Sequence, residues 1–226
     1  MEKVTIPTIK ILYEDADVLV VCKPVGALSE DASDGTPSVP MLLSAHVSDT
    51  FPITPITRLD RNVGGVMLLA KTKKAAAFLS AEVSDHQRCI KEYRAVVEGT
   101  LAEHEGELTD LLFKDSHKNK SFVVKRMRKG VKSARLAYKL LCTSLHREKQ
   151  ISLLAIRLYT GRTHQIRVQL SHRAHPLLGD GKYGGDSFYP LSLHAYALTF
   201  DHPDGRRMRF EAELPDGLPW NLFSEY

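Results

Sequence analysis

The sequence predicts an α+β fold built on a largely antiparallel, mixed β-sheet with flanking helices and loops. Many short apolar stretches with strand character follow one another, and only two or three helical stretches lie between them. A regular alternation of strands and helices, which would indicate a parallel sheet, is absent. The chain has 226 residues, 43% of them hydrophobic, which is enough to bury a sizeable core, and we expect one domain over residues 1–226.

The first 52 residues predict two strands and a long loop. Strands are expected at residues 9–13 and 18–22, joined by the turn-forming run at residues 14–17. Residues 27–52 are rich in Ser, Asp, Gly and Pro, so we expect an irregular loop around a short helix near residues 41–46. A loop of this length inside a compact domain is often functional.

The rest of the chain supplies the helices and most of the strands. A strand at residues 66–71 leads into a helix at residues 72–86, where apolar residues recur at helical spacing after Thr72, a candidate N-cap. A second helix is expected at residues 161–174, entered through a glycine turn. Further strands are expected at residues 93–97, 122–125, 136–141, 151–158, 193–200 and 208–213.

The composition argues against several classes of protein. Three scattered cysteines, Cys22, Cys89 and Cys142, argue against a disulfide framework and against a cysteine-built zinc site. No apolar run approaches the roughly 18 residues of a membrane span. The amino terminus also lacks the pattern of a signal peptide. We therefore expect a protein of the reducing cytoplasm that has no membrane partner and that is, by default, a monomer.

The net charge of +4 is mild, but the basic residues are concentrated in one segment. Eight basic residues and no acidic one lie between positions 118 and 135: Lys118, Lys120, Lys125, Arg126, Arg128, Lys129, Lys132 and Arg135. Such a stretch can attract a polyanion through phosphate contacts and counterion release. Taken alone, it is better explained as a solvated loop or hairpin.

A carboxylate between two arginines stands just before the strand expected at residues 66–71. Asp60 is flanked by Arg58 and Arg61, which should favour its ionised form. The glycines at positions 64 and 65 permit a close backbone approach or a positive φ. By itself this segment could also be a salt-bridged turn.

The segment at residues 161–170 is rich in hydrogen-bond donors. If it is helical from its start, Arg162, Gln165 and Gln169 share one face, while His164 and Arg167 are neighbours on another. Arginine and glutamine at a helix start are suitable donors to phosphates and base edges. A polar amphipathic helix would show much the same pattern.

Five motifs in a fixed order remove this ambiguity. They are Thr-Arg-Leu-Asp-Arg at residues 57–61, Lys-Glu-Tyr-Arg-Ala at 91–95, Gly-Arg-Thr-His-Gln-Ile-Arg-Val at 161–168, His-Pro-Leu-Leu-Gly-Asp-Gly-Lys-Tyr-Gly at 175–184 and Leu-His-Ala at 193–195. Together with the opening strands and the Lys-Pro-Val-Gly run at 23–26, this order resembles the RluA-like pseudouridine synthases over nearly the whole chain. The resemblance implies the pseudouridine synthase catalytic fold and an RNA substrate.

The resemblance also implies roles for individual residues. Asp60 matches the catalytic aspartate of the family, and Tyr93 the tyrosine that stacks against the target base. Arg162 looks like the active-site arginine that pairs with the aspartate, and Arg58 like the side chain that helps to displace the base. The reaction isomerises uridine without net redox change, so no cofactor and no metal are expected. Direct attack by the carboxylate and abstraction of a sugar proton both remain open.

The resemblance changes the interpretation of the basic side chains. The basic stretch at residues 118–135 is then expected to form a protein hairpin that contacts RNA. The RNA is expected to be ribosomal or transfer RNA. The expected RNA-binding residues are Arg58, Arg61, Lys125, Arg126, Arg128, Lys129, His164, Gln165 and Arg167. No separate N-terminal RNA-binding domain is expected, although many relatives have one.

The sequence departs from the family pattern beside Asp60. Thr57 stands where the family usually has His, and Val-Gly-Gly at residues 63–65 stands where it usually has Thr-Ser-Gly. These changes remove hydrogen-bonding groups that would bear on substrate positioning.

Two other functions are compatible with parts of the sequence. A protein that binds RNA without catalysis would fit the altered loop, but binding alone does not require Asp60 and Tyr93 together with Arg162. A metal-dependent hydrolase would have to use the histidines at positions 164, 172 and 175, whose spacing matches no standard zinc pattern.

Overall fold

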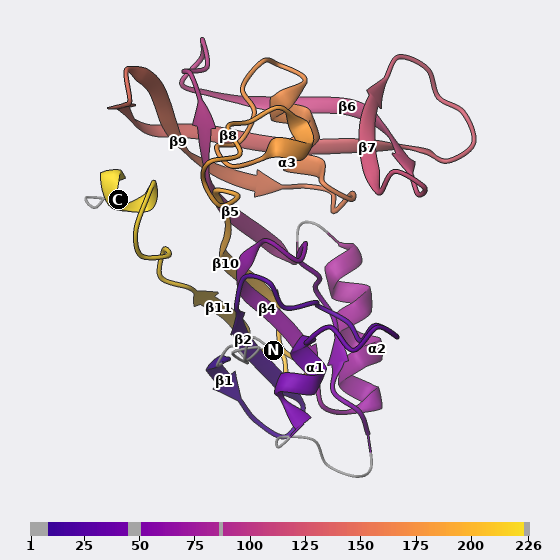
Figure 1. The fold of residues 1–226 in the computed structure, drawn as a ribbon. Coiled ribbons are helices and arrows are strands. Elements are labelled where there is room, and N and C mark those ends of the chain that lie inside the picture. The colour runs from indigo at the N-terminus through magenta and orange to yellow at the C-terminus, as the bar shows by residue number, and fades with distance from the viewer. Residues whose placement is uncertain (1–8, 45–50, 86–87, 224–226) are drawn as a thin grey trace. The chain divides into compact units, whose positions relative to one another are not determined.

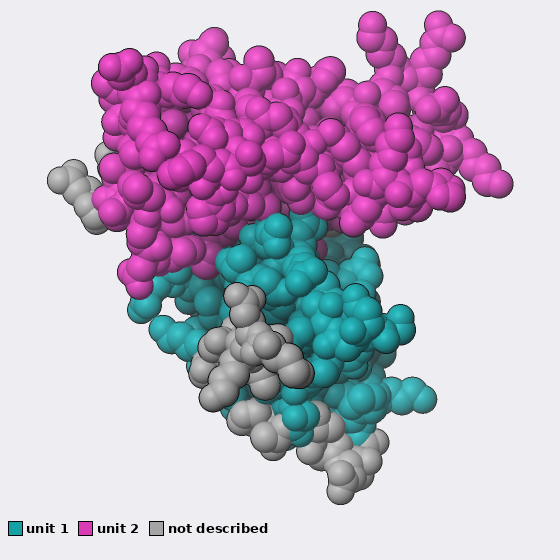
Figure 2. Space-filling view, viewed as in Figure 1, with its two compact units in different colours: residues 1–90, 195–213 teal, residues 91–194, 214–226 magenta. Residues whose placement is uncertain are grey.

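The computed structural model describes residues 9–44, 51–85 and 88–223. The chain divides into two compact units (Figure 2). Unit 1 contains residues 1–90 and 195–213, and unit 2 contains residues 91–194 and 214–226. Strands predominate in both units and helices are few (Figure 1), which confirms the predicted α+β class. None of the helices in the described parts of the chain is long and apolar enough to cross a membrane.

Unit 1 is a small sheet whose central strands are β2 and β4. Its strands are β1 (Lys10–Glu14), β2 (Val18–Lys23), β3 (Thr54–Pro55), β4 (Gly64–Ala70), β10 (Leu193–Asp201), of which residues 195–201 belong to this unit, and β11 (Arg207–Glu211). They follow the order β1-β2-β4-β10, with β11 paired to β10 and β3 paired to β4. The β1–β2, β2–β4 and β10–β11 pairs are antiparallel.

The central strands of unit 1 are buried on both faces. Along β2, Val18 and Val20 pack in one core cluster, and Leu19 and Val21 pack in a second cluster. The residues of β4 alternate between the same two clusters, since neighbouring side chains in a strand point to opposite faces. Burial on both faces explains why these strands are continuous apolar runs in the sequence.

Two helices cover unit 1. The helix α2 (Lys73–Ser84) begins after Thr72, whose Oγ1 accepts a hydrogen bond of 3.2 Å from the backbone N–H of Ala75, so the predicted N-cap is confirmed. The short helix α1 (Val39–Leu42) begins two residues earlier than the helix expected near residues 41–46. Ser38 is its N-cap, and the last two residues of the expected range lie outside the described part of the chain.

Unit 2 is an antiparallel sheet in the order β5-β9-β8-β6-β7. Its strands are β5 (Ile90–Glu98), β6 (Glu105–Asp115), β7 (Lys120–Val124), β8 (Val131–His146) and β9 (Lys149–Leu158). The sequence prediction missed β6 entirely and placed only the middle of β8. In β6 the charged residues are spread along the strand, so apolar residues alone did not mark it.

The basic stretch is not a hairpin, contrary to the sequence prediction. Both β7 and β8 pair with β6, and β6 lies between them in the sheet. Residues 125–130 therefore connect two strands that are not neighbours. The connection passes beside Phe113 of β6. The Arg128 guanidinium lies 5.2 Å from the centre of the Phe113 ring.

The second predicted helix is shorter than expected. Helix α3 (Gln165–Ser171) begins at Gln165 instead of residue 161. His164 precedes it in the left-handed conformation, with a φ of 53°. Arg162 is therefore outside the helix and does not share a helical face with Gln165 and Gln169, as the sequence interpretation assumed. Two 3₁₀ turns, η2 (Gly181–Tyr183) and η3 (Trp220–Phe223), complete unit 2.

A buried histidine in unit 1 lies between two carboxylates. The His202 side chain is 3% exposed, with Nε2 3.0 Å from an oxygen of Asp15 and Nδ1 2.8 Å from an oxygen of Asp204. A hydrogen bond from the backbone N–H of Arg206, supported by the side chains of His202 and Arg206, lowers the pKa of Asp204 to about 2. The ionised form of Asp204 is therefore favoured in the folded protein.

This arrangement predicts a pH-dependent contribution to stability. The folded pKa of Asp204 lies below the ordinary value of 3.8, so its contribution is complete above pH 3.8 and is lost as the pH falls toward 2. Asp204→Asn should be less stable than the wild type at pH 6, and the difference should shrink as the pH falls toward 2. Urea unfolding at several pH values measures it. Asp216→Asn, which changes an exposed carboxylate, serves as the control, and a pH-independent loss in Asp204→Asn would contradict the assignment.

Candidate active site

Asp60 of unit 1 lies in a tight loop that enters β4. The backbone N–H of Val63 donates a hydrogen bond of 3.0 Å to the carbonyl of Asp60, which closes a turn over residues 60–63. The loop is bound on its other side to the Lys-Pro-Val-Gly turn at residues 23–26. There the backbone N–H of Gly26 donates to the carbonyl of Arg61 at 2.8 Å.

The side chain of Lys23 is hydrogen-bonded to the backbone of this loop and of the neighbouring turn. It is 1% exposed, and its ammonium donates to the carbonyls of Pro24, Ala27 and Arg61 at 3.0, 2.7 and 3.2 Å. A buried ammonium needs such acceptors, because an unpaired charge in the interior is costly. This role is not visible in the sequence, where Lys23 belongs to a Lys-Pro-Val-Gly run that ends a strand.

The buried position also changes the acidity of Lys23. Burial lowers its pKa from 10.5 to about 8, although the negative charge of Asp60 acts in the opposite direction. At neutral pH the lysine is therefore mostly protonated. The structure thus adds a buried cation to the two arginines that flank Asp60 in the sequence.

A serine of the long loop holds the other side of the Asp60 loop. Ser29 Oγ accepts from the backbone N–H of Leu59 at 2.9 Å and donates to the Leu59 carbonyl at 2.8 Å. Two bonds to one residue fix the backbone immediately before Asp60. The long loop at residues 27–52 was expected to be functional, and this is a structural contribution that it makes.

The flanking arginines are solvent-exposed. Arg58 Nη1 lies 3.2 Å from Oε2 of Glu30, and both side chains are more than half exposed. Arg61 Nε donates to the Gly26 carbonyl at 3.2 Å. An exposed ion pair contributes little to stability, so Arg58 can exchange Glu30 for another anion at small cost.

Thr57, which departs from the family pattern, and Gly65, which matches it, both have structural roles. Thr57 is buried, and its Oγ1 accepts a hydrogen bond of 2.9 Å from the backbone N–H of Leu68 in β4. Gly65 has a φ of +116°, and a Cβ atom there would lie 2.1 Å from the carbonyl oxygen of Ala195. Only glycine fits at position 65.

Tyr93 of unit 2 lies in the middle of β5. It is 9% exposed and pairs in register with Ile156 of β9, which pairs in turn with Tyr138 of β8. Its backbone is thus fixed by the sheet, and its side chain is mostly enclosed. A rigid strand is a suitable support for an aromatic side chain that must hold one orientation.

Arg162 of unit 2 lies in the loop between β9 and α3. Its Nε donates to the carbonyl of Ser133 at 2.9 Å, and its backbone N–H donates to Oε1 of Gln165 at 3.1 Å. The first bond attaches the side chain to β8, and the second closes the loop onto the start of α3.

Two residues expected to bind RNA are buried, and their side chains form hydrogen bonds or ion pairs within the protein. Gln165 is 3% exposed and bonds Thr160, Arg162 and the Arg135 carbonyl through its side-chain amide. Arg167 is 8% exposed and forms a bidentate ion pair with buried Asp180, with distances of 2.7 and 2.8 Å. Both side chains therefore bond other parts of unit 2 and are not exposed for contact with RNA.

The remaining predicted RNA-binding residues are accessible to different degrees. Lys125, Arg126, Arg128 and Lys129 are all exposed in the connection between β7 and β8. His164 is half-buried, with Nδ1 2.9 Å from the hydroxyl of Tyr183. The connection thus presents four cations in a run of five residues, as a surface for phosphates requires.

Two of the three histidines considered as metal ligands, His164 and His175, have other contacts. Besides the contact of His164 with Tyr183, His175 Nδ1 donates to the Glu98 carbonyl at 3.0 Å. Within the described residues, no group of three or more His, Cys, Asp or Glu side chains could hold a metal ion.

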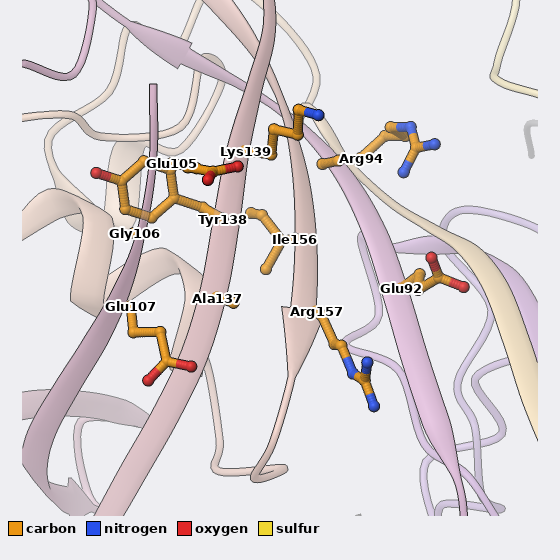
Figure 3. Close-up of a pocket in the computed structure, with 11 residues that line it drawn as sticks. Glu92, Arg94, Glu105, Gly106, Glu107, Ala137, Tyr138, Lys139, Ile156 and Arg157 are labelled. Atoms are coloured by element: carbon orange, nitrogen blue, oxygen red, sulfur yellow. The ribbon is translucent and has the colours of Figure 1, made fainter. Parts of the chain in front are cut away.

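A hollow of about 490 Å³ lies on the sheet of unit 2 (Figure 3). It is lined by strands β5, β6, β8 and β9, and the small side chains of Ala137 and Ala155 leave room for it. Its charged residues are Glu92, Glu105, Glu107, Arg94, Lys139 and Arg157. Acidic and basic side chains are equal in number there, so a polyanion would gain little from this surface.

Comparison with known proteins identifies the family. The family model for RNA pseudouridylate synthases matches residues 17–172. The uncharacterized RNA pseudouridine synthase YlyB of Bacillus subtilis is 33% identical over 222 residues, which are 92% of this chain and 70% of that protein. The ribosomal large subunit pseudouridine synthase D of Borreliella burgdorferi is 33% identical over 220 residues, which are 92% of this chain and 65% of that protein. This chain therefore spans less than two thirds of the length of the second relative.

Two solved structures share the fold. The human RNA pseudouridylate synthase domain containing 1 protein superposes with a TM-score of 0.76 at 22% identity, covering 98% of this chain and 89% of the human chain. The human domain containing 4 protein gives a TM-score of 0.73 at 24% identity, covering 91% and 88%. The predicted fold is thus found in proteins with little sequence identity to this one.

The buried ammonium of Lys23 leads to a prediction about stability. Lys23→Met keeps much of the side-chain volume but removes the donor to three carbonyls, and should lower the free energy of unfolding by roughly 1–3 kcal/mol at pH 7. The folded pKa of about 8 lies below the ordinary 10.5, so the unfolded state binds more protons between these values. The wild type should therefore gain stability relative to the variant as the pH rises from 8 toward 10.5.

Urea unfolding of both proteins at pH 7 and pH 9.5 tests this prediction. Lys74→Met, which changes an exposed lysine of α2, is the matched control and should be nearly neutral at both pH values. A Lys23→Met variant as stable as the wild type would show that the three carbonyls do not depend on the ammonium.

Proposed function

Because this chain belongs to the RNA pseudouridylate synthase family, we propose that it converts specific uridines of structured RNA into pseudouridine, with Asp60 as the catalytic carboxylate. The observation that carries the proposal is the Asp60 loop, which is bonded on both sides to buried donors. Ser29 holds the residue before Asp60, and Lys23 with Gly26 holds the residue after it. A carboxylate fixed in this way is suited to act on one atom of a bound substrate.

The proposed reaction is an isomerisation. The bond between N1 of uracil and C1′ of the ribose breaks, the uracil turns, and a bond forms between its C5 and C1′. The proton leaves C5, and N1 gains one, so atoms and electrons balance without an oxidant or reductant. Asp60 would either attack C1′ or remove a proton from the sugar; both paths need an ionised carboxylate. No cofactor or metal enters either path.

Tyr93 and Arg162 complete the proposed catalytic set. We assign Tyr93 to stacking against the target base, since it is an enclosed aromatic residue on a rigid strand. We assign Arg162 as the active-site arginine, on the match of residues 161–168 to the family motif. Arg58 is proposed to help displace the base from its stack, which costs a few kcal/mol. Its high exposure supports that role.

RNA is proposed to bind through exposed cations in both units. The exposed cations are Arg58 and Arg61 in the Asp60 loop and Lys125, Arg126, Arg128 and Lys129 in the connection between β7 and β8. Half-buried His164 is proposed as a further contact. The Borreliella relative is named for ribosomal large-subunit RNA, and we propose ribosomal or transfer RNA as the substrate here. We further propose that residues 1–226 act as one catalytic domain, as a monomer in the cytoplasm.

Tritium release from RNA tests the proposed reaction. Transcripts of ribosomal and transfer RNA carrying tritium at C5 of uridine are incubated with the protein and a chelator, without cofactor. The wild type should release tritium and Asp60→Asn should not, with a loss of at least about a thousandfold for removal of a covalent or basic catalyst. Salt-sensitive binding of RNA without release would instead favour a protein that binds RNA without catalysis.

The basic connection, which is residues 125–130 between β7 and β8, should contribute to the affinity for RNA through its positive charge. Arg126→Ser with Lys129→Ser removes two exposed cations, and should weaken RNA binding while reducing the slope of log Kd against log salt by about 1–2 units. The control is Lys73→Ser with Lys74→Ser, which removes two exposed lysines from α2. Filter binding at several salt concentrations measures both pairs. Equal effects of the two double variants would mean that only net charge matters.

A further inference from the structure

Ser121 is a buried serine in β7, the strand that leads into the basic connection at residues 125–130. It lies near the start of β7, is 2% exposed, and uses two polar groups outside its sheet. Its Oγ donates to the carbonyl of Thr163 at 2.7 Å, and its backbone N–H donates to the hydroxyl of Tyr183 at 2.8 Å. Thr163 is the residue directly after Arg162. The strand β7, which leads into the basic connection, is thus bonded to the backbone of the loop at residues 159–164. This loop contains Arg162 and is called the arginine loop.

Tyr183 is a second link between the same parts of unit 2. Its hydroxyl, which accepts from Ser121, also lies 2.9 Å from Nδ1 of His164. Its backbone carbonyl accepts a hydrogen bond of 2.6 Å from Ser171 Oγ at the end of α3. Tyr183 is 7% exposed, so these bonds are shielded from water and each counts for more than at the surface.

Hydrogen bonds from Lys120 and Lys182 join the start of β7 to η2. Lys120 donates to the carbonyl of Lys182, and Lys182 donates at 3.0 Å to the carbonyl of Asn119. The Lys120 ammonium also lies 4.8 Å from the centre of the Tyr183 ring, a cation–π distance. β7 is therefore joined to η2 by reciprocal bonds as well as by Ser121.

The arginine loop has a backbone that needs such support. His164 has a φ of 53°, a left-handed conformation that costs free energy for a residue with a Cβ. It persists because the loop is over-determined: Thr163 is held by Ser121, His164 by Tyr183, and the Arg162 backbone by Gln165. Of these three contacts, only the one made by Ser121 comes directly from the strand beside the basic connection.

We infer that Ser121 is a positioning residue for Arg162, and that it couples RNA contact at residues 125–129 to the placement of the active-site arginine. The inference rests on the proposed function. A phosphate backbone held by the connection would steady β7, and Ser121 would transmit this to the Thr163 carbonyl. Ser121 touches neither substrate nor reacting atoms, so its effect appears in turnover and not in RNA affinity.

The expected effect of removing the hydroxyl follows from geometry. Ser121→Ala leaves the Thr163 carbonyl without its donor and lets the loop relax, which moves Arg162. A displacement of about 1 Å in a catalytic group can lower the rate by up to a hundredfold, so we expect kcat to fall about ten- to hundredfold. The Kd for RNA should change less than about twofold, because no phosphate contact is removed.

The experiment measures kcat by tritium release and Kd by filter binding for four proteins: wild type, Ser121→Ala, Ser121→Thr and Ser116→Ala. Ser116→Ala is the matched control, because Ser116 is exposed in the loop before β7 and bonds Asn119 only through its carbonyl. Ser121→Thr keeps the hydroxyl and should retain most of the turnover. Unfolding curves show whether each variant is folded.

A double-mutant cycle separates positioning from general destabilisation. In an Arg162→Lys background, Ser121→Ala should lower kcat much less than in the wild type, because the two changes act through one side chain. Equal losses in both backgrounds, or unchanged kcat in folded Ser121→Ala, would overturn the inference. If Ser121→Ala does not fold, Tyr183→Phe, which removes the hydroxyl between Ser121 and His164, takes its place in the same cycle.

The failure of this inference can be told apart from failure of the proposed function. A wild type that releases no tritium from any RNA overturns the proposed function and the inference with it. An active wild type with additive effects of the two changes overturns the inference alone.

Discussion

A single buried cation determines how the Asp60 loop is built. The Lys23 ammonium is withdrawn from water and bonded to three backbone carbonyls, one of which belongs to Arg61. Burying a charge is unfavourable unless it is fully paired, so the loop and the turn at residues 23–26 must close around it together. The lowered pKa of Lys23 expresses this cost, and the negative charge of Asp60 offsets part of it. The carboxylate and its support are therefore one electrostatic unit.

The arginine loop of unit 2 follows a similar principle with neutral groups. The Arg162 side chain donates to the backbone of β8, and its backbone N–H donates to the Gln165 side chain. Ser121 and Tyr183 hold the rest of the loop. Two of the three proposed catalytic side chains, Asp60 and Arg162, thus extend from loops that buried side chains hold in place. The cations proposed to meet RNA are instead exposed and lightly bonded. This division lets phosphate contacts form at small cost while the catalytic loops stay rigid.

The sequence predicted those parts of the fold whose burial follows a simple period. The strands β2 and β4 and the helix α2 were found because apolar runs, a helical stripe and the Thr72 cap are local signals. The strand β6 was missed because charged residues are spread along it without a regular period. The hairpin was wrongly expected because strand order is not a local property. The helix at residue 161 failed for a related reason: His164 adopts a left-handed conformation that only tertiary contacts support.

The candidate site shows the same limit. The motifs directed attention to Asp60, Tyr93 and Arg162, but the residues that support the two loops are a lysine, serines and a tyrosine with no distinctive spacing. Their importance depends on burial and on carbonyls far away in the chain, such as Arg61 for Lys23 and Thr163 for Ser121. Gln165 and Arg167 are the opposite case. Both are polar residues of a motif, but their side chains form hydrogen bonds inside unit 2.

Hydrogen exchange tests the role of Lys23 most directly. The backbone N–H groups of Gly26 and Val63 are bonded to the carbonyls of Arg61 and Asp60, so their exchange rates report on the loop itself. In Lys23→Met these two amides should exchange much faster than in the wild type, while Leu112 in β6 of unit 2 should be unchanged. Unchanged exchange at Gly26 and Val63 would contradict the account, because the loop would then hold its form without the buried ammonium.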